Sequence, residues 1–195
     1  MARGHDLVVV GTSWGGLEVL RRILSALPAE LDAAVVIAQH RGPDSHPTAF
    51  RDLLGAVTRM HVREADDKDT LRTGTVYIAP PDYHLLVGGE GFSLSTDEPV
   101  LYARPSIDVL FESAAESHRE RCVGVLLTGA NADGARGLAR IEELGGTAIV
   151  QDPDEAQRKE MPQAALAAVP RARVALTEDI AKLVVELCGV AKVPA

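Results

Sequence analysis

The clearest signal in the hydrophobic pattern is a set of three short runs that are apolar at every position. They are residues 7–10 (LVVV), 33–38 (AAVVIA) and 123–127 (VGVLL). A strand with one solvated face alternates apolar and polar positions, whereas a strand of a parallel sheet is buried on both faces and apolar throughout. The runs therefore predict three central strands of a parallel sheet.

Helical periodicity fills most of the segments between and after these runs. Residues 17–24 (LEVLRRIL) place apolar side chains at helical spacing and stop before Pro28. We expect further helices at residues 48–57, 108–119, 134–144, 162–168 and 178–187, and further strands at residues 60–63 and 147–151. This alternation predicts an α/β fold with a doubly wound, mostly parallel sheet and helices on both faces.

Residues 75–95 interrupt the alternation. Residues 75–80 (TVYIAP) are typical of a strand, and residues 84–87 and 92–95 are typical of two strands joined by a glycine-rich turn. We therefore expect an inserted antiparallel hairpin around residues 75–95.

Length, charge and cysteine content narrow the range of functions. The 195 residues fit a single domain, residues 1–195, and the net charge of −8 argues against a nucleic-acid-binding surface. No apolar run approaches the roughly 18 residues that a membrane-spanning helix needs, and the first strand is too short for the core of a signal peptide. Cys122 and Cys188 lack the spacing of a metal site. We expect a cytoplasmic protein with reduced cysteines, no metal and no membrane insertion.

The first apolar run leads into a glycine-flanked serine. Residues 11–16 (GTSWGG) match the spacing G-x-S-x-G around Ser13. This spacing is typical of a nucleophile on a sharp strand-to-helix turn, where free helix amides can stabilise an oxyanion. A small-residue turn that only packs a helix against a strand is the alternative. A P-loop is discounted because Leu-Glu follows Gly16, and a dinucleotide fingerprint fails because Ser13 occupies a glycine position.

The other two apolar runs are followed by a histidine and an aspartate. His40 comes soon after residues 33–38, and Asp133 follows residues 123–127. Because parallel strands end at one edge of a sheet, these side chains are expected to meet Ser13 there. Serine, histidine and aspartate are the groups of nucleophilic acyl chemistry.

His40 and Asp133 could each have a structural role instead of a catalytic one. His40 could be a structural histidine at a strand end, and His46 in the next loop is its nearest competitor as a base. Asp133 lies at an expected helix start, where aspartate commonly acts as an N-cap. The chain order of serine, histidine and aspartate also differs from that of a standard α/β-hydrolase.

An ordered set of motifs carries a family resemblance. The motifs are GTSWGG at 11–16, IAQH at 37–40, YIAP at 77–80, RPSIDVLF at 104–111, LTGANADG at 127–134 and MP at 161–162. Together they make the chain similar, from about residue 7 to 187, to the catalytic domain of the chemotaxis protein-glutamate methylesterases. The resemblance implies Ser13 as nucleophile, His40 as base and Asp133 as the orienting carboxylate, with no cofactor.

The resemblance also implies the substrate. It points to hydrolysis of glutamate γ-methyl esters on the cytoplasmic helices of chemoreceptors, with deamidation of particular glutamines as a related activity. Family members usually carry an N-terminal receiver domain, for which residues 1–6 leave no room. We therefore expect a stand-alone catalytic domain, with a separate receiver-domain protein as a candidate partner.

Two residues of the expected cleft depart from the family pattern. Trp14 stands where a threonine is common, and Ala130 stands where a methionine is common. Their backbone amides, together with Thr12, are the candidates for the oxyanion hole and the cleft wall. Packing in the core is the alternative role for Trp14. The altered neighbourhood leaves two other functions open: a non-catalytic or regulatory binding module on the same scaffold, and a hydrolase for another ester or amide.

Overall fold

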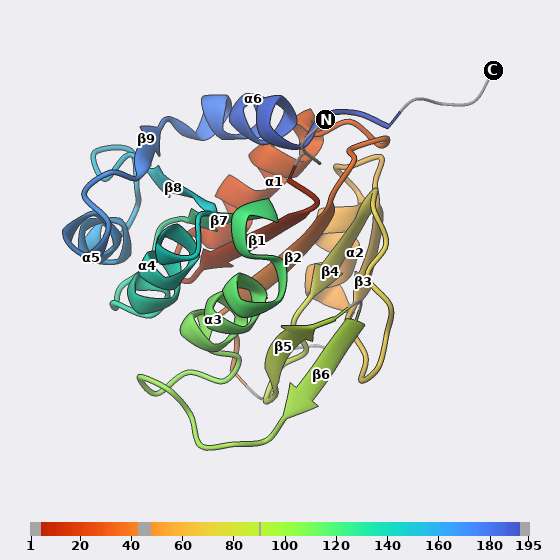
Figure 1. Ribbon diagram of the computed structural model, residues 1–195, viewed down its shortest axis with the longest axis horizontal. Coiled ribbons are helices and arrows are strands. Elements are labelled where there is room, and N and C mark those ends of the chain that lie inside the picture. The colour runs from red at the N-terminus through yellow and green to blue at the C-terminus, as the bar shows by residue number, and fades with distance from the viewer. Residues whose placement is uncertain (1–4, 43–47, 90, 192–195) are drawn as a thin grey trace.

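A parallel sheet forms the centre of the protein (Figure 1). The computed structural model describes residues 5–42, 48–89 and 91–191. Within that part of the chain the sheet has seven strands in the order β3-β4-β2-β1-β7-β8-β9, and every neighbouring pair is parallel. The strands are β1 (Leu7–Thr12), β2 (Ala34–Gln39), β3 (His61–Glu64), β4 (Thr75–Ile78), β7 (Cys122–Leu126), β8 (Thr147–Gln151) and β9 (Arg173–Ala175).

The three fully apolar runs form the middle of this sheet. Every residue of β1, β2 and β7 is buried. Successive side chains alternate between two hydrophobic clusters: Leu7 and Val9 belong to one, and Val8 and Val10 belong to the other. The continuous apolar pattern is therefore explained by burial on both faces of the sheet.

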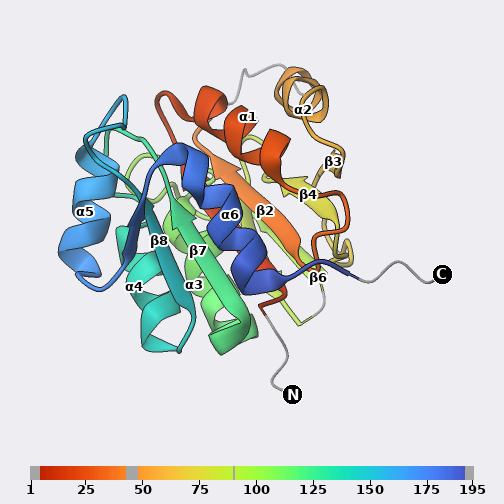
Figure 2. The ribbon, with the colours of Figure 1, turned by 90° about the horizontal axis from the view of Figure 1, so that it is seen from above.

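Helices cover both faces (Figures 1 and 2). One face carries α1 (Gly16–Ala26), α2 (Ala49–Gly55) and α6 (Thr177–Cys188), whose buried residues join the cluster of Val8. The other face carries α3 (Ile107–His118), α4 (Ala135–Glu143) and α5 (Glu160–Ala168), whose buried residues join the cluster of Leu7. A short 3-10 helix (Arg119–Arg121) leads from α3 into β7. The predicted doubly wound fold is confirmed.

The antiparallel hairpin is also confirmed and is narrower than the expected range. It consists of β5 (His84–Gly88) and β6 (Gly91–Ser95), which form a separate two-stranded sheet among the described residues. Leu85 and Phe92 pack into the core cluster shared with α3. The start of the range, β4, pairs in parallel with β2 and belongs to the main sheet.

The strand order reverses at β1, which lies between β2 and β7. The chain first builds the sheet from β1 towards β3 and later from β7 towards β9. Ligand sites of open α/β sheets form at such a switch point, beyond the carboxyl ends of the strands. Ser13 and His40 directly follow two of these strand ends.

Other expectations concern the cysteines and membrane insertion. Cys122 and Cys188 are free and buried, and burial raises the pKa of the Cys188 thiol to about 12. Across the described residues, none of the helices has the length and apolar character required to traverse a bilayer.

Candidate active site

The backbone of Ser13 is fixed by the ends of the two strands that flank β1. Its N–H donates to Thr128 O at 2.9 Å, and its carbonyl accepts from Gln39 Nε2 at 2.8 Å. The turn needs glycine at two positions. Gly15 has φ 82°, and a Cβ on Gly16 would clash with Thr12 Oγ1. The chain thus leaves β1 in a tight turn that presents a partly exposed Ser13.

His40 lies at the same edge and contacts the predicted carboxylate. Its backbone N–H donates to Thr12 O at 3.1 Å, which extends the β1–β2 pairing. Its ring Nε2 lies 2.7 Å from Asp133 Oδ2. Because an ionised carboxylate only accepts hydrogen bonds, Nε2 is the nitrogen that carries the proton in the neutral ring, and Nδ1 is then the basic nitrogen. The imidazole is thus oriented and keeps a free base nitrogen.

Asp133 is fully buried and caps a helix, though not the helix that follows it. Its carboxylate accepts from Ser106 Oγ at 2.9 Å and from the amides of Ile107 at 2.7 Å and Asp108 at 3.0 Å. These groups form the N-terminus of α3, whose dipole favours a negative charge there. Asp133 therefore does cap a helix N-terminus, as the alternative interpretation expected, but the helix is α3 and not α4, which follows Asp133 in the sequence.

Burial alone would raise the pKa of Asp133. The hydrogen bonds from His40 and from the amides of Asp108 and Ile107 outweigh burial and hold the pKa below its ordinary value. Asp133 is therefore ionised at neutral pH, which favours a protonated imidazole whenever His40 accepts a proton.

Two pockets meet at His40. One has a volume of about 530 Å³ and is lined by Ser13, Trp14 and Gln157, among others. The second has a volume of about 570 Å³ and is lined by Tyr102 and Asn131, among others. His40 lines both pockets, so a substrate with its reacting group beside His40 has room on two sides.

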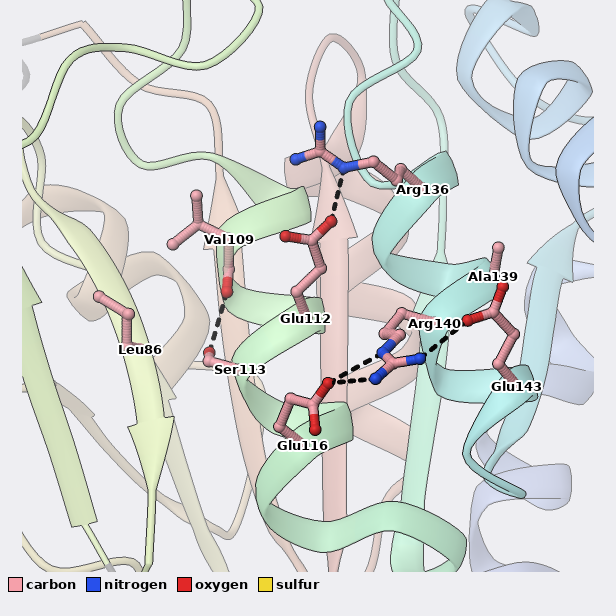
Figure 3. Close-up of a pocket in the computed structure, with 9 residues that line it drawn as sticks. All are labelled: Leu86, Val109, Glu112, Ser113, Glu116, Arg136, Ala139, Arg140 and Glu143. Atoms are coloured by element: carbon pink, nitrogen blue, oxygen red, sulfur yellow. Dashed lines mark hydrogen bonds and ion pairs between the residues drawn. The ribbon is translucent and has the colours of Figure 1, made fainter.

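A third pocket, of about 540 Å³, lies away from this edge, between β5, α3 and α4 (Figure 3). Its acidic side chains are engaged in ion pairs, Glu112 with Arg136 and both Glu116 and Glu143 with Arg140. The hydroxyl of Ser113 donates to the carbonyl of Val109. With its charged groups paired in this way, this pocket is a poor candidate for acyl chemistry.

The three oxyanion and cleft candidates occupy different environments. Thr12 is buried, and its hydroxyl donates to Thr128 O at 2.9 Å. Trp14 is 61% exposed, so core packing is wrong for its side chain. Its ring lies 5.9 Å from the guanidinium carbon of Arg158. Ala130 is exposed in the loop after β7. Among the described residues the amides of Trp14 and Ala130 have no acceptor, which leaves them available to an oxyanion.

Sequence reasoning missed three residues that support this arrangement. Gln39 ties Ser13 to the end of β2, and Arg41, with a side chain 6% exposed, lines both pockets. Asp108 accepts the amides of Gly134 at 2.9 Å and Gly137 at 2.8 Å. Gln39 and Arg41 flank His40 in the sequence, and this proximity to the predicted base is the only sign of their role, which is not specific.

His46, the alternative histidine, lies outside the described residues.

Comparison with known proteins identifies the family. The sequence model of the CheB methylesterase family matches residues 8–184. The chain belongs to the CheB methylesterase family. The predicted resemblance is thereby confirmed, and with it the assignment to a family of carboxylic ester hydrolases.

Relatives of this CheB methylesterase domain differ in length. A putative protein-glutamate methylesterase/protein-glutamine glutaminase of Leptospira interrogans is 43% identical over 184 residues, which are 94% of this chain and 95% of that protein. The corresponding enzyme of Geobacillus kaustophilus is 39% identical over 188 residues, 94% of this chain and 54% of that protein. The chain thus spans nearly all of the first relative and about half of the second.

A solved structure matches the fold. The catalytic domain of the Thermotoga maritima CheB methylesterase superposes with a TM-score of 0.90 and 29% identity. The match covers 96% of this chain and 100% of that domain.

Proposed function

We propose that the protein is a protein-glutamate methylesterase that acts through a Ser13-His40-Asp133 triad. The observation that carries the proposal is the 2.7 Å contact between His40 Nε2 and Asp133 Oδ2, beside a pocket that His40 shares with Ser13. The names of its relatives supply the substrate class, a methyl ester of a glutamate side chain in a protein. The substrates are methylated cytoplasmic helices of chemoreceptors, which would place the enzyme in the cytoplasm.

The first half of the reaction forms an acyl-enzyme. His40 Nδ1 accepts the proton of the Ser13 hydroxyl as Oγ attacks the γ-carbonyl carbon of the ester. The amides of Trp14 and Ala130 stabilise the negative charge on the carbonyl oxygen. When the intermediate collapses, the bond between the carbonyl carbon and the methoxy oxygen breaks, and protonated His40 gives its proton to that oxygen, which leaves as methanol.

The second half releases the glutamate. A water molecule gives a proton to His40 Nδ1 and attacks the acyl carbon, and the bond to Ser13 Oγ then breaks with return of that proton to the serine. Asp133 stays ionised throughout and stabilises the imidazolium in both halves. A glutamine amide can follow the same sequence with ammonia as the leaving group, which corresponds to the glutaminase activity named for the relatives.

The decisive experiment measures methanol release from a methylated chemoreceptor. Ser13→Ala is expected to lower turnover by roughly 10³-fold or more. Ser25→Ala is the matched control, because Ser25 is exposed on α1 and donates to the carbonyl of Arg22. Equal turnover in the Ser13 variant and the wild type would exclude a serine nucleophile.

Two further measurements test the two alternative functions. A fluorophosphonate probe labels an activated serine, so an unlabelled Ser13 would indicate a binding module on the same scaffold. Ser13-dependent turnover of simple esters without methanol release from the receptor would indicate a hydrolase for another substrate.

A further inference from the structure

The loop between β6 and α3 contains a turn in an unusual conformation. Val100 and Ala103 exchange backbone hydrogen bonds of 3.1 and 2.9 Å around Leu101 and Tyr102. The φ angle is 47° at Leu101 and 64° at Tyr102. A two-residue turn with both φ angles positive favours Asn-Gly or Gly-Gly, so large side chains at both positions are strained.

Burial does not compensate for this strain. Leu101 is 49% exposed and Tyr102 is 103% exposed. The side chains therefore add little to the hydrophobic core, and a fully exposed tyrosine ring gains nothing from folding. Strained backbone conformations concentrate at sites that bind ligands, where the surrounding structure holds them.

The surrounding structure holds this turn firmly. Arg104 Nη2 donates to Asp82 Oδ1 at 2.6 Å, and Arg104 Nη1 donates to the carbonyls of residues 96 and 97 at 2.9 and 3.1 Å. The buried His84 joins the same loop to α3, because its Nε2 donates to Glu98 O at 3.1 Å and its Nδ1 accepts from Ser106 N at 3.1 Å. The turn is thus anchored to the helix that holds Asp133.

The turn also borders the proposed reaction site. Leu101 and Tyr102 line the pocket of about 570 Å³ that His40 lines too. An α-helix with its side chains is about 10–12 Å across. Ser13 lines the other pocket that His40 lines, so a helix of this width whose esterified side chain reaches Ser13 lies over the surface where the two pockets meet.

We propose that Leu101 and Tyr102 form a preorganised docking contact for the helix that carries the methyl ester. The contact receives an apolar side chain within about one helical turn of the esterified glutamate. This inference rests on the proposed function and adds the part of the enzyme that recognises the protein around the reacting group. A turn fixed before binding loses little conformational entropy on binding, and exposed aromatic residues contribute strongly to protein contacts.

The test replaces the two side chains and keeps the turn. The double variant Leu101→Asn/Tyr102→Gly places the preferred residues for positive φ at both positions, so its melting temperature is expected to be equal to or higher than that of the wild type. We expect KM for the methylated receptor to rise about tenfold or more, with kcat unchanged. Turnover of p-nitrophenyl acetate, which lacks a helix, is expected to stay within about twofold of the wild type.

Two further variants sharpen the result. Tyr102→Phe keeps the ring and is expected to retain the wild-type KM. Val174→Ala is the matched control, because it shortens an apolar side chain that is 49% exposed, like that of Leu101, and lies on the edge strand β9. An unchanged KM in the double variant, or an equal loss with p-nitrophenyl acetate, overturns the docking contact.

The outcome separates this inference from the proposed function. If Ser13→Ala abolishes methanol release and the double variant binds the receptor like the wild type, only the docking contact is wrong. If the wild type releases no methanol from the receptor and the Ser13→Ala variant does not bind the methylated receptor, both are wrong.

Discussion

Asp108 and Asp133 cap each other's helices: the Asp133 carboxylate caps α3, where Asp108 lies, and the Asp108 carboxylate caps α4, which begins just after Asp133. Asp133 accepts the amide of Asp108 at 3.0 Å, and Asp108 accepts the amide of Gly134, the residue after Asp133, at 2.9 Å. The N-termini of α3 and α4 are therefore tied to each other through two buried carboxylates. The position of the proposed triad carboxylate thus depends on Asp108, for which we infer a positioning role.

Removal of the Asp108 carboxylate is predicted to destabilise the protein and to slow catalysis. Asp108→Ala leaves the buried amides of Gly134 and Gly137 without an acceptor, so the free energy of unfolding is expected to fall by about 2–4 kcal/mol. Displacement of Asp133 is expected to reduce kcat on the order of 10–100-fold. Urea unfolding and methanol release measure the two effects.

Asp108→Asn provides the conservative comparison. It keeps an oxygen that can accept both amides, so its loss of stability is expected to be below about 1.5 kcal/mol. Asp154→Ala, on an exposed loop residue, is the control. If the Asp108→Ala variant has the same free energy of unfolding as the wild type, these capping hydrogen bonds do not hold the two helices together.

The depressed pKa of Asp133 predicts a dependence of stability on pH. Folding favours the ionised carboxyl, so its contribution is complete above the unfolded-state pKa, near 4. The contribution is lost as the pH falls through the lower folded-state pKa. The difference in free energy of unfolding between wild type and Asp133→Asn is therefore expected to be largest near pH 6–7 and to shrink below about pH 4.

The same variant tests catalysis. Asp133→Asn is expected to lower kcat by roughly 10³–10⁴-fold, because an amide can present a donor to His40 and favour the wrong tautomer. Denaturant unfolding from pH 3 to pH 7 and methanol release at pH 7 are the measurements. A stability difference independent of pH would contradict the ionised, hydrogen-bonded carboxylate.

The sequence was informative where one physical requirement dominated. Two-sided burial demands apolar residues throughout β1, β2 and β7, so these strands and the positions of Ser13 and His40 at their ends could be predicted. β9 was not predicted because a three-residue edge strand has exposed Arg173 and Val174 and no periodicity.

Other features depended on contacts between distant parts of the chain. The amides that Asp133 caps lie 25 and 26 residues away in sequence, and the local pattern favoured its own helix instead. The turn at Leu101 and Tyr102 has no glycine or asparagine at its centre, so nothing in the sequence marked it as a turn.

In the glycine turn after Ser13, one added methyl group at Gly16 is predicted to lower both stability and activity. In Gly16→Ala the new Cβ would clash with Thr12 Oγ1 and lie 2.6 Å from Gln39 Oε1, where Thr12 and Gln39 are both buried. We expect a loss of about 1–3 kcal/mol in the free energy of unfolding. Methanol release is also expected to fall, because relief of the clash moves Ser13.

Gly88→Ala is the matched glycine control. A Cβ there meets no atom within 4 Å among the described residues, so stability is expected to change by less than about 0.5 kcal/mol. Equal unfolding curves for the two alanine variants would show that the turn can relax around the methyl group.

Trp14 offers a separate test of the cleft, because its side chain and its backbone amide have different predicted roles. Trp14→Thr keeps the amide and removes a ring that is 61% exposed, so stability is expected to change by less than about 0.5 kcal/mol. The rate with p-nitrophenyl acetate is expected to stay within about twofold, whereas KM for the methylated receptor is expected to rise because the ring lines the pocket of Ser13. Steady-state kinetics with both substrates, and with Trp14→Phe as the conservative variant, distinguish these effects. A large loss of kcat with p-nitrophenyl acetate in Trp14→Thr would instead mean that the ring itself shapes the oxyanion hole.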